Sequence, residues 1–328
     1  MAFLSRVMMV TGLLGVVLAA EGCAVSSDSG SGEADRFREA LPLQEDVKLG
    51  VPGSADGSGT GTKSVGGGLH IATEGAGGPA SSYQFTREIT GAVDFTTAII
   101  LGGLWAIVNS PPSSLEAKKA VWGPGSGNAL EPAIWRFTVS EVGDKEYDYV
   151  LEGQPKSGGD WLPVLTGHGY GKSRPEHRQG WFQFDNDNYK TLDPSKGKDE
   201  GSTKITFDLK QLPATIDVQL RPAAAKGALD VGVTHEAGGA GKVHITGTGD
   251  LDDAKNTKLE NIEMLSRWSS TGAGRSQWTF AGGDLPIASV TASECWGTNF
   301  ARTYYKDTVD YQPPSGDETT CAFGANDL

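Results

Sequence analysis

The three cysteines, Cys23, Cys295 and Cys321, are the residues of this chain whose chemistry is easiest to assign. Cys295 and Cys321 lie near the C-terminus, and neither has a second cysteine beside it, as a zinc knuckle requires. A disulfide between them would close a loop of roughly 25 residues and stabilise the fold by on the order of 3 kcal/mol. Such bonds persist in oxidising compartments, so this pairing requires export. We predict the Cys295–Cys321 disulfide, with two unpaired buried thiols as the alternative.

The N-terminus has the features of an export signal. A positive residue, Arg6, precedes an apolar stretch from Val7 to Ala20, and small residues follow. This stretch of about 14 residues is too short to cross a bilayer as a helix. We therefore expect residues 1–22 to be a signal peptide that is removed.

The segment Ala20-Glu21-Gly22-Cys23 resembles the lipobox of bacterial lipoproteins. Gly22 and Cys23 fit that motif, whereas Ala20 stands where Leu is usual and Glu21 is an acidic departure from it. The resemblance implies that Cys23 is lipidated and anchors the chain in a membrane. Because Ala24 rather than Asp follows, it also implies the outer membrane. Cleavage by the ordinary signal peptidase, which would give a soluble secreted or periplasmic protein with a free thiol, is the alternative.

Four aromatic residues form a candidate ligand platform. They lie in or near the loops of one region and could stack on sugar rings or other apolar ligands: Trp161, Tyr170, Trp181 and Tyr189. Aromatic residues of β domains also pack in the core or at its rim, which is the alternative. The ligand itself, whether a small molecule, a glycan or a protein, is not specified by these residues.

Two motifs that suggest cofactors fail on spacing. The segment from Gly167 to Ser173 ends like a P-loop, but Thr166 occupies the position that requires glycine, and a proline follows where a helix should begin. The run from Asp185 to Asn188 offers oxygen ligands, yet an EF-hand loop would need glycine and glutamate where Lys190 and Lys196 stand. We read this run as a strand-end turn and expect neither a nucleotide nor any other cofactor.

The histidines do not indicate a metal site. His235 and His244 flank a probable hairpin turn, but the register that buries the neighbouring valines places His235 on the buried face and His244 on the opposite one. We expect no metal.

The charge balance argues against nucleic acid as a partner. Lys and Arg total 28 against 41 Asp and Glu, a formal net charge of −13, and no basic run offsets it. Affinity for a nucleic-acid backbone comes largely from Lys and Arg that neutralise phosphates. The expected membrane contact is the N-terminal lipid.

Composition divides the chain into a tether and a folded part. Residues 23–82 are rich in Gly and Ser, which favours a flexible tether with a short docking segment near residues 37–47. Apolar spacing predicts a buried helix over residues 88–109. From about residue 133 onward, short alternating segments predict roughly nine or ten strands. Residues 83–328 are thus expected to be a single domain.

Sequential strands joined by short turns favour a mainly β fold, an antiparallel meander. The economical arrangement is a strongly curved sheet or open half-barrel covered by the one N-terminal helix, with a two-sheet β-sandwich as the alternative. We expect a non-enzymatic envelope protein that binds a ligand or partner or has a scaffolding role. An envelope hydrolase with an unrecognised acidic site, or a carrier of lipid or another hydrophobic ligand, is the alternative.

Overall fold

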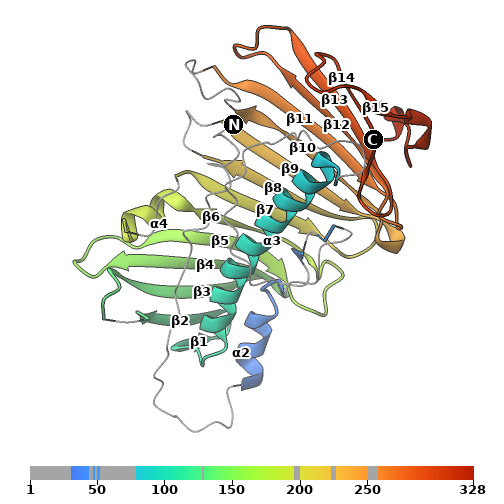
Figure 1. Cartoon of the computed structure of the whole chain (residues 1–328). Coiled ribbons are helices and arrows are strands. Elements are labelled where there is room, and N and C mark those ends of the chain that lie inside the picture. Colours follow the sequence, from blue (N-terminus) through green and yellow to red (C-terminus); the bar gives the residue numbers. More distant parts are fainter. Residues whose placement is uncertain are drawn as a thin grey trace. The chain divides into compact units, whose positions relative to one another are not determined.

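The computed structural model describes residues 31–43, 47–48, 50–51, 79–127, 129–195, 200–222, 227–249 and 258–328 (Figure 1). The expected signal peptide and Cys23 lie outside the described residues. Within them the chain is mainly β, and fifteen antiparallel strands form one meander sheet that is not closed. The predicted fold class is thereby confirmed, and one sheet takes the place of the two-sheet alternative.

The strands follow one another in the sheet in chain order. Their bounds are β1 Ser114–Glu116, β2 Lys119–Gly125, β3 Ala133–Gly143, β4 Glu146–Pro155, β5 Leu162–Tyr170, β6 Gln179–Asp185, β7 Ser202–Asp208, β8 Ala214–Arg221, β9 Ala228–His235, β10 Gly241–Gly249, β11 Glu260–Trp268, β12 Gly274–Ala281, β13 Ser289–Trp296, β14 Arg302–Asp307 and β15 Ser315–Gly316. The helices are α2 Ser31–Arg38, α3 Ser81–Val108 and α4 Asn186–Leu192, with 3-10 turns η2 Ala237–Gly239, η3 Glu318–Thr320 and η4 Ala325–Asp327.

The described residues group into two compact units. Unit 1 contains residues 50–51, 79–94 and 211–328, and unit 2 contains residues 31–48 and 95–210, apart from the positions that are not described. The sequence-based boundary of a single domain at residue 83 stays a prediction, and each unit is described by itself below.

Alternation along the strands separates a buried inner face from an outer face. In β3, Trp135, Phe137 and Val139 are buried while the residues between them are partly exposed. The same pattern of period two runs through β9 and β10, where Val231 and Val233 are paired in register with Ile245 and Val243. We call the face that carries these buried apolar side chains the inner face and the opposite one the outer face.

The helix α3 begins seven residues earlier than the predicted start at residue 88. Its first backbone amides, from Ser81 and Ser82, are bonded by the carboxylate of Glu294. The first amides of a helix need hydrogen-bond partners outside the helix. Here the partner is Glu294 on the distant strand β13, and no local sequence pattern reveals it. Within the described residues, no helix combines the length and apolar character needed to cross a membrane.

The helix α2 lies inside the expected tether and, within unit 2, packs against β4 and the end of α3. Phe37 is fully buried and its ring meets that of Tyr147 edge-on, with centroids 5.8 Å apart. Arg38 donates hydrogen bonds to the carbonyl oxygens of Val108, at 2.6 Å, and Ser110, at 3.1 Å. The packed segment starts at Ala34, also buried, and therefore earlier than the docking segment expected near residues 37–47.

Candidate functional site

The register of unit 2 places one row of polar and aromatic side chains across the outer face of five strands. From β3 to β7 this row consists of Ser140, Asp148, His168, Trp181 and Thr206, each paired with the next. None of these side chains takes part in the buried inner face. The row is therefore a rigid, solvent-accessible array built by strand pairing alone.

The centre of this row is His168, which is held by two carboxylates. Its Nδ1 lies 2.7 Å from Oδ1 of Asp148, and its Nε2 lies 3.4 Å from Oε1 of Glu146. The edge of its ring meets Tyr170, with centroids 5.0 Å apart and planes at 86°. Trp181 is its partner on β6. We call Glu146, Asp148, His168, Tyr170 and Trp181 the His168 cluster.

Glycines on either side of His168 explain the glycine-rich motif there. A Cβ on Gly167 would lie 2.3 Å from the ring of Tyr149, and one on Gly169 would lie 2.2 Å from the carbonyl oxygen of Ala40. These two glycines face inward, where their lack of a side chain lets other groups approach closely. The motif that resembles a P-loop is thus a strand whose glycines serve packing while His168 and Tyr170 point outward.

Cations lie over the partly exposed aromatic rings of this face. The Nζ of Lys204 is 4.8 Å from the centroid of Trp181, and the guanidinium of Arg174 is 5.9 Å from that of Tyr170. Each cation covers one face of its ring and holds the ring in place. The cluster therefore combines carboxylate acceptors, an imidazole and two oriented aromatic side chains.

The structure brings together two of the four residues predicted as a platform. Tyr170 and Trp181 both belong to the His168 cluster. Trp161 immediately precedes β5, at the end opposite Tyr170, and its ring lies under Arg136, 4.2 Å away. Tyr189 is 3% exposed and packs with Trp135 and Phe184 in the core, so its assignment to a ligand platform is corrected. Tyr189 points into the core because it lies on the buried side of the helix α4.

The predicted turn at residues 185–188 is instead the start of α4. The side chain of Asp185 accepts a hydrogen bond from the amide of Asn188, at 2.8 Å, which is an N-cap. Asp187 accepts one from the amide of Gly201, at 2.9 Å. These oxygens therefore satisfy backbone donors of their own loop.

The geometry of His168 does not match a Ser-His nucleophile pair. Both of its ring nitrogens face carboxylate oxygens rather than a hydroxyl, whereas a nucleophile needs a hydrogen bond to its base. Among the described residues, no group of three or more His, Cys, Asp or Glu side chains is arranged to hold a metal ion. The arrangement is instead suited to hydrogen bonding and stacking with a polar ligand.

The two histidines of unit 1 lie on the faces that their register predicts. His235 is on the inner face and partly buried, and burial lowers its pKa. His244 is on the outer face, where its Nε2 lies 3.1 Å from Oε1 of Glu263. They point to opposite sides of one hairpin and do not form a site.

A buried ionic cluster in unit 1 escaped the sequence analysis. Glu294, 2% exposed, accepts hydrogen bonds from the amide of Ser82 at 2.6 Å and from Nε of Arg302 at 2.5 Å. Arg302 also donates to Oγ of Ser81, at 2.8 Å, and to Oε1 of Gln312, at 3.0 Å. The carboxylate is therefore committed to the start of α3. Apart from their place in an alternating strand, Glu294 and Arg302 carry no signal that would mark them.

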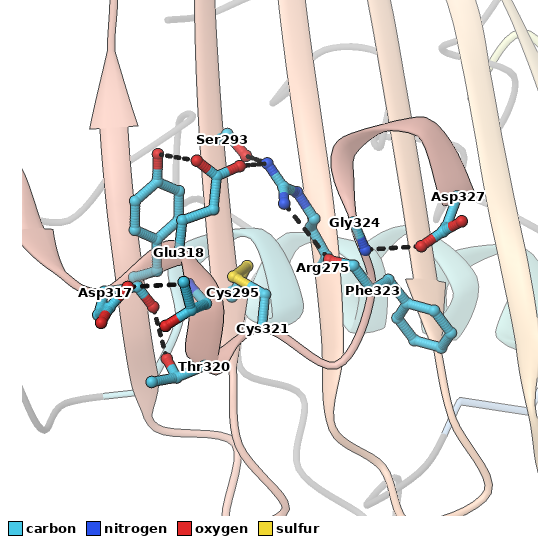
Figure 2. The surroundings of a disulfide bond; sticks show 12 residues. Arg275, Ser293, Cys295, Asp317, Glu318, Thr320, Cys321, Phe323, Gly324 and Asp327 are labelled. Atoms are coloured by element: carbon cyan, nitrogen blue, oxygen red, sulfur yellow. Dashed lines mark hydrogen bonds and ion pairs between the residues drawn. A yellow bond between two sulfur atoms is a disulfide. The ribbon is translucent and has the colours of Figure 1, made fainter.

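The predicted disulfide is confirmed and fastens the C-terminal segment to the outer face of unit 1. Cys295 of β13 and Cys321 are joined, with their Cα atoms 5.5 Å apart. Figure 2 shows Arg275 beside this bond, between the carboxylate of Glu318, at 2.6 Å, and the carbonyl oxygen of Phe323, at 3.3 Å. We call residues 317–328 the C-terminal clamp.

No protein-family model, curated protein or solved structure matches this chain. The role of the His168 cluster is therefore inferred from its own chemistry.

Proposed function

We propose that this chain is a lipid-anchored bacterial envelope protein that binds a glycan through the His168 cluster without catalysing a reaction. The observation that carries the proposal is His168 held between Asp148 and Glu146, next to Tyr170 and Trp181, on the outer face of a rigid sheet. The lipobox-like segment that ends at Cys23 supports the anchor and an outer-membrane location.

The chemistry of the cluster suits a sugar. Hydroxyl groups of a sugar donate to carboxylates such as Asp148 and Glu146, and the C–H face of the ring packs on aromatic side chains such as Trp181. Because the cluster lies on strands rather than on loops, its groups are held in place before a ligand binds, which lowers the entropic cost of binding. The glycan strands of the bacterial cell wall are the polymer of this class in the same compartment.

The rival proposal, an envelope hydrolase, would need a close pair of carboxylates free to act on a bond. Asp148 and Glu146 lie two residues apart on β4, but each faces a ring nitrogen of His168. Two buried carboxylates of unit 1 have other tasks. Glu294 accepts hydrogen bonds from the first turn of α3 and from Arg302. Asp307 accepts hydrogen bonds from the amides of Val309 and Gln312 and shapes its loop. These contacts favour the binding role.

The anchor is tested by metabolic labelling with a fatty-acid analogue. The native chain should incorporate the label and fractionate with membranes, and Cys23→Ser should do neither. An unlabelled, soluble native chain would show that the anchored part of the proposal is wrong.

Glycan binding is tested by co-sedimentation with purified cell-wall glycan. His168→Ala should weaken binding at least tenfold, equivalent to about 1.4 kcal/mol. His244→Ala is the matched control, because His244 is also an outer-face histidine paired with a carboxylate, and it should bind like the native chain. Equal losses in the two variants, or no binding by the native chain, would contradict the proposed site.

A further inference from the structure

The helix α2 is fixed to one particular edge of unit 2. Arg36 donates to the carbonyl oxygen of Ala117 and pairs with Glu141, and Glu39 accepts a hydrogen bond from the amide of Lys172. These partners belong to the β1–β2 turn, the end of β3 and the β5–β6 turn. Alternate turns of an antiparallel meander lie at the same ends of the strands, so α2 lies at one set of strand ends. We call the turns at these strand ends the α2 edge (residues 116–119, 141–146 and 170–178).

Only a short piece of chain separates Cys23 from α2. Residues 24–30 lie between Cys23 and Ser31, the first residue of the helix. Eight steps of fully extended chain span at most about 28 Å. A lipid on Cys23 therefore places the bilayer surface within that distance of α2, whatever path the chain takes.

The side chains of the α2 edge suit a lipid surface. It exposes the ammonium groups of Lys118, Lys119 and Lys172, none of which forms an ion pair with a described carboxylate, beside the exposed carboxylates of Glu116 and Asp144. Val142, 54% exposed, is an apolar residue near the end of β3, two residues before the β3–β4 turn. Ammonium groups attract anionic headgroups, and a small apolar side chain fits the boundary between headgroups and acyl chains.

The opposite edge of unit 2 has a different character. Its lysine Lys190 is paired with Glu200 at 2.7 Å, and Lys156 donates to a backbone carbonyl. Asp160 and Asp187 are exposed there. This edge also exposes Leu130, but both of its described lysines, Lys156 and Lys190, already have partners and are less available to anionic headgroups.

We infer that the α2 edge of unit 2 is a membrane-facing surface that lies on anionic headgroups of the bilayer to which the chain is anchored. This inference rests on the proposed lipid at Cys23. The lipid supplies the attachment, and α2 with the lysines selects which edge faces the membrane.

The test uses the full-length lipidated chain in phosphatidylethanolamine vesicles that contain phosphatidylglycerol and a nitroxide-labelled lipid. A fluorophore is attached in Asp144→Cys, at the α2 edge, or in Asp160→Cys, at the opposite edge. Both native residues are exposed aspartates in turns, so the variants are matched. The label at 144 should be quenched several-fold more strongly than the label at 160. Equal quenching, or stronger quenching at 160, would overturn the inference.

A second measurement separates the orientation from the anchor. Reversing the charges with Lys118→Glu, Lys119→Glu and Lys172→Glu should lower quenching at position 144 several-fold, while the chain still floats with the vesicles. Undiminished quenching in this triple variant would show that the lysines do not orient the edge. If the native chain carries no lipid and does not float, the anchor of the proposed function has failed rather than the choice of edge.

Discussion

At the scale of single residues, the two histidines of the β9–β10 hairpin show how the same side chain behaves on the two faces of one sheet. Burial lowers the pKa of His235, and its Nε2 is buried without a hydrogen-bond partner among the described residues. His244 is exposed beside Glu263. Their difference follows from the strand period alone, which is why the sequence was sufficient to predict it.

The lowered pKa of His235 makes the stability of the fold depend on pH. Below the ordinary histidine pKa of about 6.5, the unfolded chain binds a proton that the folded chain does not, so this residue destabilises the fold as the pH falls from about 6.5 to its lower folded pKa. His235→Gln should remove that part of the loss, as measured by urea unfolding at about pH 7.5 and about pH 5. The same pair of measurements on the native chain is the reference. The expectation would be contradicted if His235→Gln showed the native dependence.

At the scale of elements, the C-terminal clamp stabilises unit 1 through one covalent and several polar contacts. Besides its contacts with Arg275, the clamp accepts a hydrogen bond from Arg267 at the carbonyl of Asp327, at 2.8 Å. The guanidinium of Arg267 also lies 4.9 Å from the ring centroid of Phe323. The clamp thus covers outer-face side chains of β11 to β13 that would otherwise be open to solvent.

Cutting the covalent link should have a measurable cost. The two cysteines are 26 residues apart, and closing a loop of that size stabilises a fold by about 3 kcal/mol in the chain-entropy model. Cys321→Ser should lower the free energy of unfolding by roughly that amount. The same loss should follow reduction of the native chain, whereas reductant should leave Cys321→Ser unchanged. A native chain whose denaturation midpoint does not respond to complete reduction would disprove this contribution.

Local patterns predicted the strands and the disulfide, but not the elements that depend on distant partners. The alternation of Trp135, Phe137 and Val139 is visible in the sequence because every second residue of a strand points to the buried face. The early start of α3 depends on Glu294, and the inward turn of Tyr189 depends on the cap of α4 at Asp185. The His168 cluster could be predicted only in part, since strand register, not sequence proximity, joins Trp181 to Asp148 and His168.

At the scale of the whole molecule, under the proposed lipid anchor at Cys23, the docked α2 determines which segment would set the distance between the membrane and unit 2. The prediction from composition makes all of residues 23–82 the tether that sets this distance. Because α2 is fixed by Arg36, Phe37 and Arg38, only residues 24–30 remain between Cys23 and the docked helix. The glycine-rich residues 52–78 follow the docking point and add nothing to this reach.

Two insertions distinguish these readings. About ten Gly and Ser residues placed within residues 24–30 raise the root-mean-square span of this segment from about 15 Å to about 23 Å and should weaken the quenching of a label at position 144. The same insertion within residues 52–78 should leave that quenching unchanged. If the second insertion weakened quenching as much as the first, α2 would not be the point at which the tether ends.

The contact between Glu294 and the start of α3 also bears on when unit 1 folds. Glu294 accepts a hydrogen bond from the amide of Ser81, and the two residues are 213 positions apart in the chain. A contact of such separation raises the contact order, and folding slows as contact order rises. Synthesis must pass β13 before the first turn of α3 can acquire its partner. Unit 1 is thus expected to stay incompletely folded until nearly all of the chain has been made. The export proposed for this chain would benefit, because an unfolded chain can be threaded through a membrane.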